Sequence, residues 1–236
     1  MFISNFNQFK LNESIHDRVT LKAVFLVGGP GSGKTTVAHK MFAGLPFKVV
    51  DSDRMFEFLL KKNKLSMKID QDNEEQVAER KHVDITFRNM DKLIDEMLPL
   101  IIDGTGKHYD KIKTQKEMME AHGYDTFVLV VNVPIDIAIA RDANRERSLG
   151  AEQVERQWHA VQENIEKYAE LFDHRLYVVS GEISKKGEKY LDNVADKIVN
   201  LPLTNPIGKW IMRKLHDVRG SYLHDLKEPI PKMDEL

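Results

Sequence analysis

The chain contains no cysteine, which excludes disulfide bonds, thiolate metal sites and cysteine nucleophiles. Its nine histidines are scattered singly, and no two have the His-x₃₋₅-His spacing of a zinc site. Long apolar runs are also missing, since the most apolar stretch, residues 127–140, is broken by Asn132, Pro134 and Asp136. Near residue 1 no basic segment precedes an apolar run, so we expect a cytoplasmic protein with no membrane contact.

An excess of positive charge is absent as well. The 236 residues include 35 Lys and Arg against 37 Asp and Glu, a formal net charge of −2. This balance argues against a protein held on nucleic acid by a global basic field, although a local basic patch remains compatible with it. With 42% hydrophobic residues, the chain is long enough for one domain with a buried core and short extensions.

The most specific motif in the chain is Gly-Gly-Pro-Gly-Ser-Gly-Lys-Thr at residues 28–35, which fits the phosphate-binding pattern G-x-x-x-x-G-K-[ST]. Its glycines allow successive backbone N–H groups to turn inward around an anion, and Lys34 can reach the β- and γ-phosphates. The Thr35 hydroxyl can bind Mg²⁺. A mostly apolar segment precedes the motif and a helical one follows it. We therefore expect a phosphate site formed by Gly28, Gly29, Pro30, Gly31, Ser32, Gly33, Lys34, Thr35 and Thr36.

Apolar strand segments alternate with helical segments along the rest of the chain. The expected strands are residues 21–27, 47–50, 99–102, 127–133 and 176–179. This alternation predicts an α/β fold, a parallel five-stranded sheet with helices on both faces. We expect an N-terminal extension over residues 1–18, the main domain over 19–200 with a lid near 141–156, and a C-terminal extension over 201–236. In the last of these, residues 207–215 predict an amphipathic helix, either docked on the core or contacting a partner.

Polar residues follow three of the expected strands. The first strand ends at Gly28, the second at Asp51 and Asp53, and the third at Asp103. Because ligands of such sheets bind at the carboxyl ends of the strands, these residues mark the expected active site.

Two further absences bear on the type of reaction. The Asn-Lys-x-Asp motif of GTP specificity is missing, because the only Asn-Lys, at Asn63, is followed by Leu65 and Ser66. Many ATP-hydrolysing machines carry a Glu directly after the strand-ending Asp, whereas here Asp103 is followed by Gly104. Both absences favour transfer to a bound acceptor over hydrolysis.

At this point the chain resembles the small P-loop kinases that include zeta toxins and the kinase domain of polynucleotide kinases. The resemblance covers about residues 20–180. It rests on the phosphate loop, Val50-Asp51-Ser52-Asp53, Ile101-Ile102-Asp103-Gly104-Thr105, Pro134 followed by Arg141 and Arg145, and the helix of Trp158 and Tyr168. It implies the nucleoside-kinase-like P-loop NTPase fold, with ATP and Mg²⁺ as cofactors.

In that group an Asp after the second strand accepts the proton of the attacking hydroxyl, as general-base catalysis requires. The resemblance gives this role to Asp53, with Asp51 as the alternative. The group often has an Arg three residues further on, where this chain has Phe56, and Arg54 lies next to Asp53 instead. We expect Asp51 and Arg54 to contact the substrate. Capping of a helix by the two aspartates is the competing interpretation.

The resemblance also implies roles for Asp103, Thr105 and a set of arginines. Asp103 would hold Mg²⁺ or orient the substrate, and Thr105 would bind the acceptor. Arg141 and Arg145 resemble lid arginines, whose planar guanidinium groups stabilise the charge of phosphoryl transfer. Their spacing of four places both on one helix face, and we favour them over Arg147. Trp158 and Tyr168 are expected in the core.

These features predict a kinase that transfers the γ-phosphate of ATP to a hydroxyl. A nucleic acid, through a 5′-hydroxyl end or a hydroxymethylated base, is the favoured acceptor, because residues 61–68 and the C-terminal helix are basic. A nucleotide sugar, as in zeta toxins, and a small metabolite are the alternatives. A nucleotide-dependent binding module or ATPase is the alternative of another class.

Overall fold

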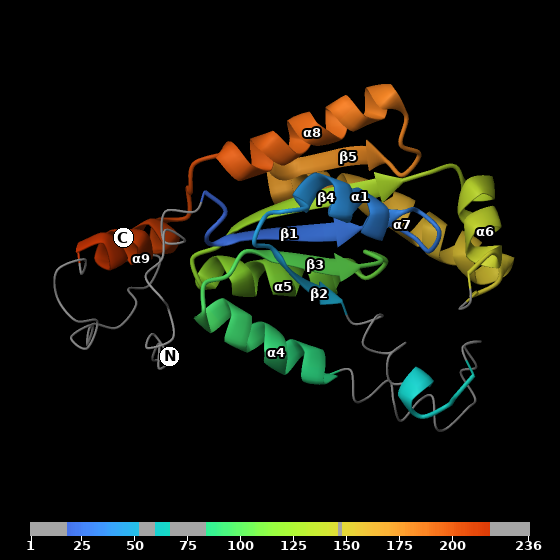
Figure 1. The fold of residues 1–236 in the computed structure, drawn as a ribbon, viewed down its shortest axis with the longest axis horizontal. Coiled ribbons are helices and arrows are strands. Elements are labelled where there is room, and N and C mark those ends of the chain that lie inside the picture. Colours follow the sequence, from blue (N-terminus) through green and yellow to red (C-terminus); the bar gives the residue numbers. More distant parts are fainter. Residues whose placement is uncertain (1–17, 52–59, 67–83, 146–147, 218–236) are drawn as a thin grey trace.

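The computed structural model describes residues 18–51, 60–66, 84–145 and 148–217 of the chain. Five parallel strands form one sheet with the order β2-β3-β1-β4-β5. They are β1 (Lys22–Val27), β2 (Lys48–Asp51), β3 (Leu100–Gly104), β4 (Asp125–Asn132) and β5 (Leu176–Ser180). The predicted parallel five-stranded sheet is therefore confirmed (Figure 1).

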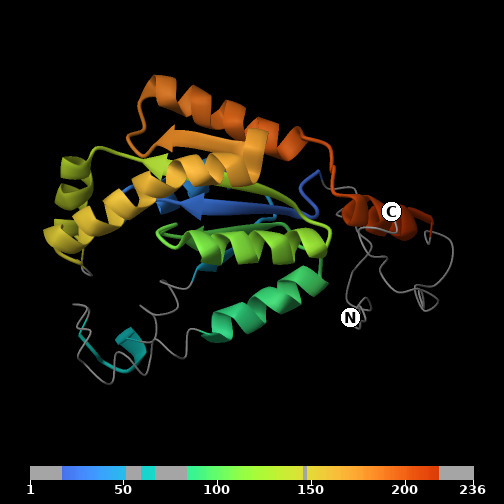
Figure 2. The ribbon, with the colours of Figure 1, turned by 180° about the vertical axis from the view of Figure 1, so that it is seen from behind.

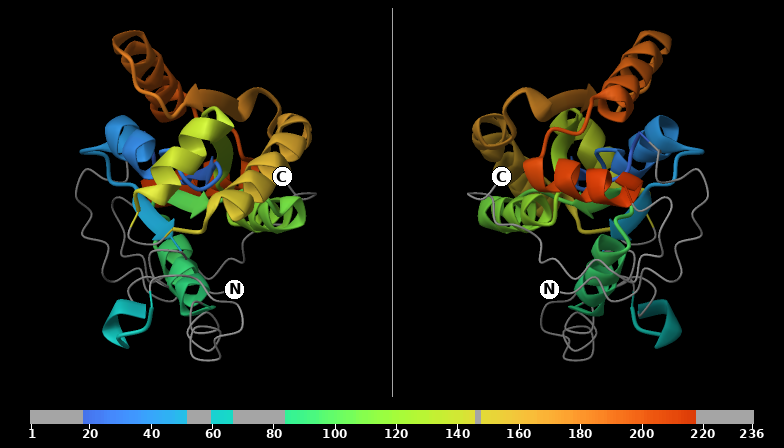
Figure 3. Two further views of the ribbon diagram at one scale, coloured as in Figure 1. Left: turned by 90° about the vertical axis from the view of Figure 1, so that its right-hand side faces the viewer. Right: turned by 90° about the vertical axis from the view of Figure 1, so that its left-hand side faces the viewer.

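Helices cover both faces of this sheet. They are α1 (Lys34–Phe42), α4 (Asp84–Asp95), α5 (Tyr109–Ala121), α6 (Ile135–Ala143), α7 (Ala151–Phe172), α8 (Lys185–Asn200) and α9 (Pro206–Asp217), with a short 3₁₀ turn, η3 (Asp173–Arg175), before β5. From behind, α5 and α7 lie across the sheet (Figure 2). Looking along the strands, α1 lies on one side of the sheet and α5 and α7 lie on the other (Figure 3).

The alternation of strand residues produces one apolar core on each face. Val24, Leu26 and Ile101 pack with buried residues of α1 and α8. The neighbouring residues Phe25 and Ile102 point to the other face, where buried residues of α4, α5, α7 and α9 cover them. The central strand β1 is buried on both faces along its whole length.

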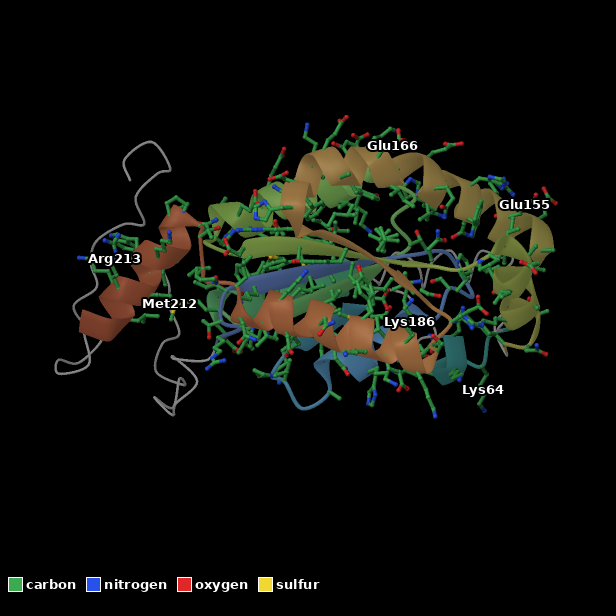
Figure 4. The ribbon with its side chains drawn as sticks, turned by 90° about the horizontal axis from the view of Figure 1, so that it is seen from above. Lys64, Glu155, Glu166, Lys186, Met212 and Arg213 are labelled. Atoms are coloured by element: carbon green, nitrogen blue, oxygen red, sulfur yellow. The ribbon has the colours of Figure 1, made fainter. Side chains whose placement is uncertain are left out.

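The C-terminal helix α9 is docked on this second core, as one of the two interpretations predicted. Ile207, Ile211 and Leu215, spaced by four residues, are all buried there. Its N-terminus is tied to β4, because the Asp125 carboxylate accepts hydrogen bonds from the backbone N–H groups of Thr204 and Asn205. Arg213, exposed on α9, lies at the opposite end of the molecule from Lys64 (Figure 4).

A buried cation joins β1 to the end of α8. The Lys22 ammonium, with the residue 1% exposed, donates to the carbonyl oxygens of Ile198, Val199 and Leu201 at 2.7–2.8 Å. These carbonyls belong to the last turn of α8 and the residue after it, where a helix leaves acceptors without intrahelical donors. Within the described residues, none of the helices combines the length and the apolar composition needed to cross a bilayer.

Candidate phosphate and acceptor site

The phosphate loop runs from the end of β1 into α1. Gly33 is the N-cap of α1 in the left-handed conformation, with φ +86°. Gly31 has φ +74°, and a Cβ there would lie 2.2 Å from the carbonyl oxygen of Ala138 in α6. Only glycine allows both the positive φ and the close approach to Ala138 at this position. The loop thus places the N-terminus of α1, the positive end of its dipole, at the carboxyl edge of the central strand.

The loop also holds a buried hydroxyl without a partner. Ser32 is 3% exposed, and its Oγ makes no hydrogen bond to any part of the chain that the structure describes. A buried polar atom normally has a partner, and the oxygens of a bound phosphate would supply one. Lys34 extends its Nζ back over the loop, 2.8 Å from the carbonyl oxygen of Gly28. These residues fit a nucleotide phosphate.

The remaining members of the predicted phosphate site lie in the same turn. Gly28, Gly29 and Pro30 are buried at its start, and Thr35 and Thr36 are exposed in the first turn of α1. The hydroxyl of Thr35 and the carboxylates described next are oxygen donors of the kind that Mg²⁺ binds. No group of three or more His, Asp or Glu side chains able to hold a metal occurs in the described ranges. A magnesium site here would therefore use one or two carboxylates together with phosphate oxygens, as is usual for nucleotide enzymes.

Two aspartates end neighbouring strands at the same level. Asp51 of β2 is the register partner of Asp103 of β3, so their Cα atoms are about 4.8 Å apart. Ile101, two residues before Asp103, packs with α1, and alternation puts Asp103 on that same face of the sheet. Both side chains are half-buried. Asp53 and Arg54, the other predicted residues after β2, lie outside the described residues.

The segment after β3 is fixed to both neighbouring elements. The carbonyl oxygen of Thr105 accepts a hydrogen bond of 3.2 Å from the N–H of Gly28. Tyr168 and Asn164, both buried in α7, donate to the carbonyl oxygen of Gly106, the tyrosine hydroxyl at 2.6 Å. Burial raises the pKa of Tyr168 above its usual 10, so its hydroxyl keeps its proton and remains a donor into the alkaline range. Thr105 and Asp103 are thereby held next to the phosphate loop.

Arg141 lies against the phosphate loop from α6. Its Nη1 is 3.4 Å from the carbonyl oxygen of Gly31 and 3.2 Å from that of Gly181, which follows β5. Arg145 is not on the same helix face, contrary to the prediction, because α6 ends at Ala143. At this helix end the Asn144 side chain donates to the carbonyl oxygen of Ala140, the acceptor that the backbone N–H of Asn144 would use in a continuing helix. Arg145 is exposed, and Arg147 lies outside the described residues.

Of the two aromatic residues of α7 that we expect in the core, only Tyr168 is fully buried. Trp158 is half-buried, packs against a small apolar cluster around Ala138, and donates its Nε1–H to the carbonyl oxygen of Val133 at 2.9 Å. Its backbone is 3.7 Å from the position that a Cβ on Gly29 would occupy. The backbone of Trp158 therefore packs directly against the phosphate loop at Gly29.

Three residues that sequence reasoning missed belong to this site. Gly181 is so close to the phosphate loop that a Cβ on it would lie 1.7 Å from the carbonyl oxygen of Ser32. Asn164 holds the segment after β3, and Asp142 closes the connection after α6. No local motif marks any of them. Each is defined by a contact between segments far apart in the chain.

Comparisons with known proteins bear on the family and the fold of this chain. A family model described as an AAA domain matches residues 24–168. Among solved structures, a chain of the PezAT toxin–antitoxin system of Streptococcus pneumoniae aligns with a TM-score of 0.52 and 16% identity, over 85% of this chain and 99% of that one. A gluconokinase from Sinorhizobium meliloti aligns with a TM-score of 0.47 and 10% identity, over 85% and 98% of the two chains. A search of curated proteins found no match. At this level of identity the structural likeness concerns the fold alone, an α/β P-loop NTPase fold.

Proposed function

The chain belongs to the AAA-domain family of P-loop proteins, and on that premise we propose that it is a kinase transferring the γ-phosphate of Mg-ATP to a hydroxyl. The observation that carries the proposal is the pair Asp51 and Asp103 on adjacent strand ends, beside a loop built for phosphates. A carboxylate at the end of β2 can accept the proton of an acceptor hydroxyl. Asp103 is followed by Gly104 and not by the Glu that orients water in many ATP-hydrolysing machines.

The proposed reaction is an in-line displacement. The acceptor oxygen forms a bond to the γ-phosphorus, the bond from that phosphorus to the β–γ bridging oxygen breaks, and ADP leaves. The proton of the acceptor hydroxyl passes to an aspartate after β2, Asp53 or Asp51, and from there to solvent. When bound, Mg²⁺ would neutralise charge on the β- and γ-phosphate oxygens.

The residues of the chain divide these tasks. The N–H groups of the loop and Lys34 hold the phosphates, and the buried Ser32 hydroxyl gains the partner that it lacks. Thr35 and Asp103 would bind the metal ion. Arg141, already seated between Gly31 and Gly181, would place positive charge beside the transferred group. Arg145 would have to approach from the segment after α6.

A nucleic acid is the acceptor that we favour. Lys61, Lys62 and Lys64 are exposed. Their segment, residues 60–66, lies at the end of the molecule toward which the strands point (Figure 1), and Lys64 is labelled there in Figure 4. An extended polyanion could reach the site from this end. The basic residues of α9 do not add to this argument, because α9 lies at the other end (Figure 1). The acceptor group would be a 5′-hydroxyl end or a hydroxymethylated base.

The test is transfer of labelled γ-phosphate from Mg-ATP to a panel of acceptors. The panel holds 5′-hydroxyl DNA and RNA, DNA with hydroxymethylated pyrimidines, UDP-N-acetylglucosamine and common nucleosides. We expect label in a nucleic acid, lost in Lys34→Ala and in either Asp53→Asn or Asp51→Asn. Label in the nucleotide sugar or a nucleoside would keep the kinase and refute the nucleic-acid acceptor. ATP binding with no labelled acceptor would favour a nucleotide-dependent binding module.

A further inference from the structure

The connection between α6 and α7 is closed by one carboxylate. Asp142, in the last turn of α6, is 1% exposed. Its Oδ2 accepts hydrogen bonds from the N–H of Leu149 at 2.8 Å, the N–H of Gly150 at 3.3 Å and the hydroxyl of Ser148 at 2.9 Å. A single oxygen on one helix therefore gathers the donors that precede the next helix.

This carboxylate anchors the residues that directly precede α7. The 22-residue helix α7 begins after Gly150, which has no side chain and provides no side-chain hydrogen bond to the helix. Helix N-termini are usually capped by the preceding residue itself, and they favour negative charge. Asp142 supplies negative charge near this end from the preceding helix, and its hydrogen bonds with the N–H groups of Leu149 and Gly150 tie the start of α7 to α6.

The two helices that Asp142 joins both contact the phosphate loop. Arg141, its neighbour in α6, donates to the carbonyl oxygens of Gly31 and Gly181. From α7, Trp158 lies behind the same loop, near Gly29. Both helices therefore border the loop that the guanidinium group of Arg141 contacts.

The second carboxylate oxygen of Asp142, Oδ1, indicates that this side chain does more than fix the start of α7. Asp142 Oδ1 is buried and has no hydrogen-bond partner in the part of the chain that the structure describes. An orphaned buried oxygen costs stability, and such exceptions tend to occur at functional sites. A neutral side chain could accept the same hydrogen bonds from residues 148–150 without leaving a charged oxygen unsatisfied.

We propose that Asp142 is a positioning residue of the nucleotide site, which locks α6 against α7 and thereby holds Arg141 at the phosphate loop. The inference rests on the proposed function in one respect, that Arg141 contacts the bound nucleotide. Asp142 itself contacts neither nucleotide nor acceptor. Its effect on the site passes through Arg141.

A double-mutant cycle on nucleotide affinity tests this. The dissociation constant of a fluorescent ATP analogue is measured with Mg²⁺ for the wild type, Arg141→Ala, Asp142→Ala and the double variant. We expect each single variant to weaken binding about tenfold, as loss of a charge-assisted contact does. The double variant should equal Arg141→Ala to within about twofold, because both changes remove the same contact.

Two controls separate positioning from a general loss of structure. Glu155→Gln removes a carboxylate on α7 that is exposed near the same helix connection (Figure 4), and it should bind the analogue like the wild type. Ser148→Ala removes one of the three donors to Asp142, should unfold at nearly the wild-type temperature, and should weaken binding about twofold to threefold. If Asp142→Ala does not fold, the affinity of the milder variant Ser148→Ala still tests the proposal.

The outcomes are distinct. Additive losses in the double variant, or wild-type affinity in both Asp142→Ala and Ser148→Ala, would overturn the proposal. Because affinity is measured without an acceptor, the cycle can succeed even if no phosphate transfer is found. In that case the kinase proposal fails and the positioning role stands. Where an acceptor is labelled, the same cycle in kcat should again be non-additive.

Discussion

Gly181 allows a sharp test of how the phosphate loop keeps its shape. A Cβ at this position would lie 1.7 Å from the carbonyl oxygen of Ser32, whereas real Cβ contacts are essentially never below 3.0 Å. In Gly181→Ala the two backbones must therefore separate by more than about 1 Å. The backbone of Gly181 is not in the left-handed region, so the alanine adds a steric clash without conformational strain.

In Gly181→Ala we expect the phosphate loop to shift rather than the backbone of residue 181. Gly181 is tied to the end of β4 by a hydrogen bond of 3.0 Å from its N–H to the carbonyl oxygen of Asn132, and its own carbonyl accepts from Arg141. Overpacking of this kind costs about 1–3 kcal/mol. If this destabilisation affects only the phosphate-binding conformation of the loop, the dissociation constant of ATP rises about 5- to 150-fold.

Calorimetric titration of Mg-ATP into the variant gives this constant directly, and thermal unfolding reports stability beside it. The matched control is Gly187→Ala, in the first turn of α8, where the nearest atom to the new Cβ is the Ser184 hydroxyl at 3.3 Å. Alanine is the better helix former there, so affinity should not change and stability should not fall. An unchanged ATP affinity in Gly181→Ala would refute the reasoning.

Two further predictions concern stability. Lys22→Met should lower the free energy of unfolding by about 2–3 kcal/mol in urea titrations, because three carbonyl oxygens at the end of α8 lose their charged donor; a loss below about 0.5 kcal/mol would contradict this. Burial raises the pKa of Tyr124 and Tyr168 above the usual 10. Their neutral forms are favoured in the folded state, so stability should hold below pH 10 and fall above it, where unfolded tyrosines ionise. Tyr124→Phe should flatten that fall, and an unaltered alkaline slope would disprove the assignment.

The sequence contains enough information for the elements and for the phosphate loop. Apolar runs and a glycine-rich motif are local patterns, and the strands and α1 lie within a few residues of their expected bounds. The alignment of Asp51 with Asp103 follows from the parallel sheet, because both residues end strands at the same edge. The role of each residue in the proposed reaction remains a prediction.

What could not be predicted depends on contacts between distant segments. The order that inserts β3 between β2 and β1 is a matter of pairing, and periodicity within a strand does not encode its neighbours. Arg145 was misplaced because a spacing of four implies one face only while the helix continues, and α6 ends at Ala143. The contributions of Gly181 and Asn164 arise from close approach and burial, which no short motif reveals.

The packing around the phosphate loop has a consequence for the order in which the chain assembles. The loop occupies eight consecutive residues, yet its walls are the backbone of Val131 behind Gly28, Ala138 behind Gly31, and Gly181 against Ser32. A nascent chain that has emerged only through β1 and α1 carries the whole motif but none of these walls. We therefore expect the ability to bind nucleotide to be acquired late in synthesis, after β5 has joined the sheet. From then on bound nucleotide stabilises the finished fold and none of its precursors.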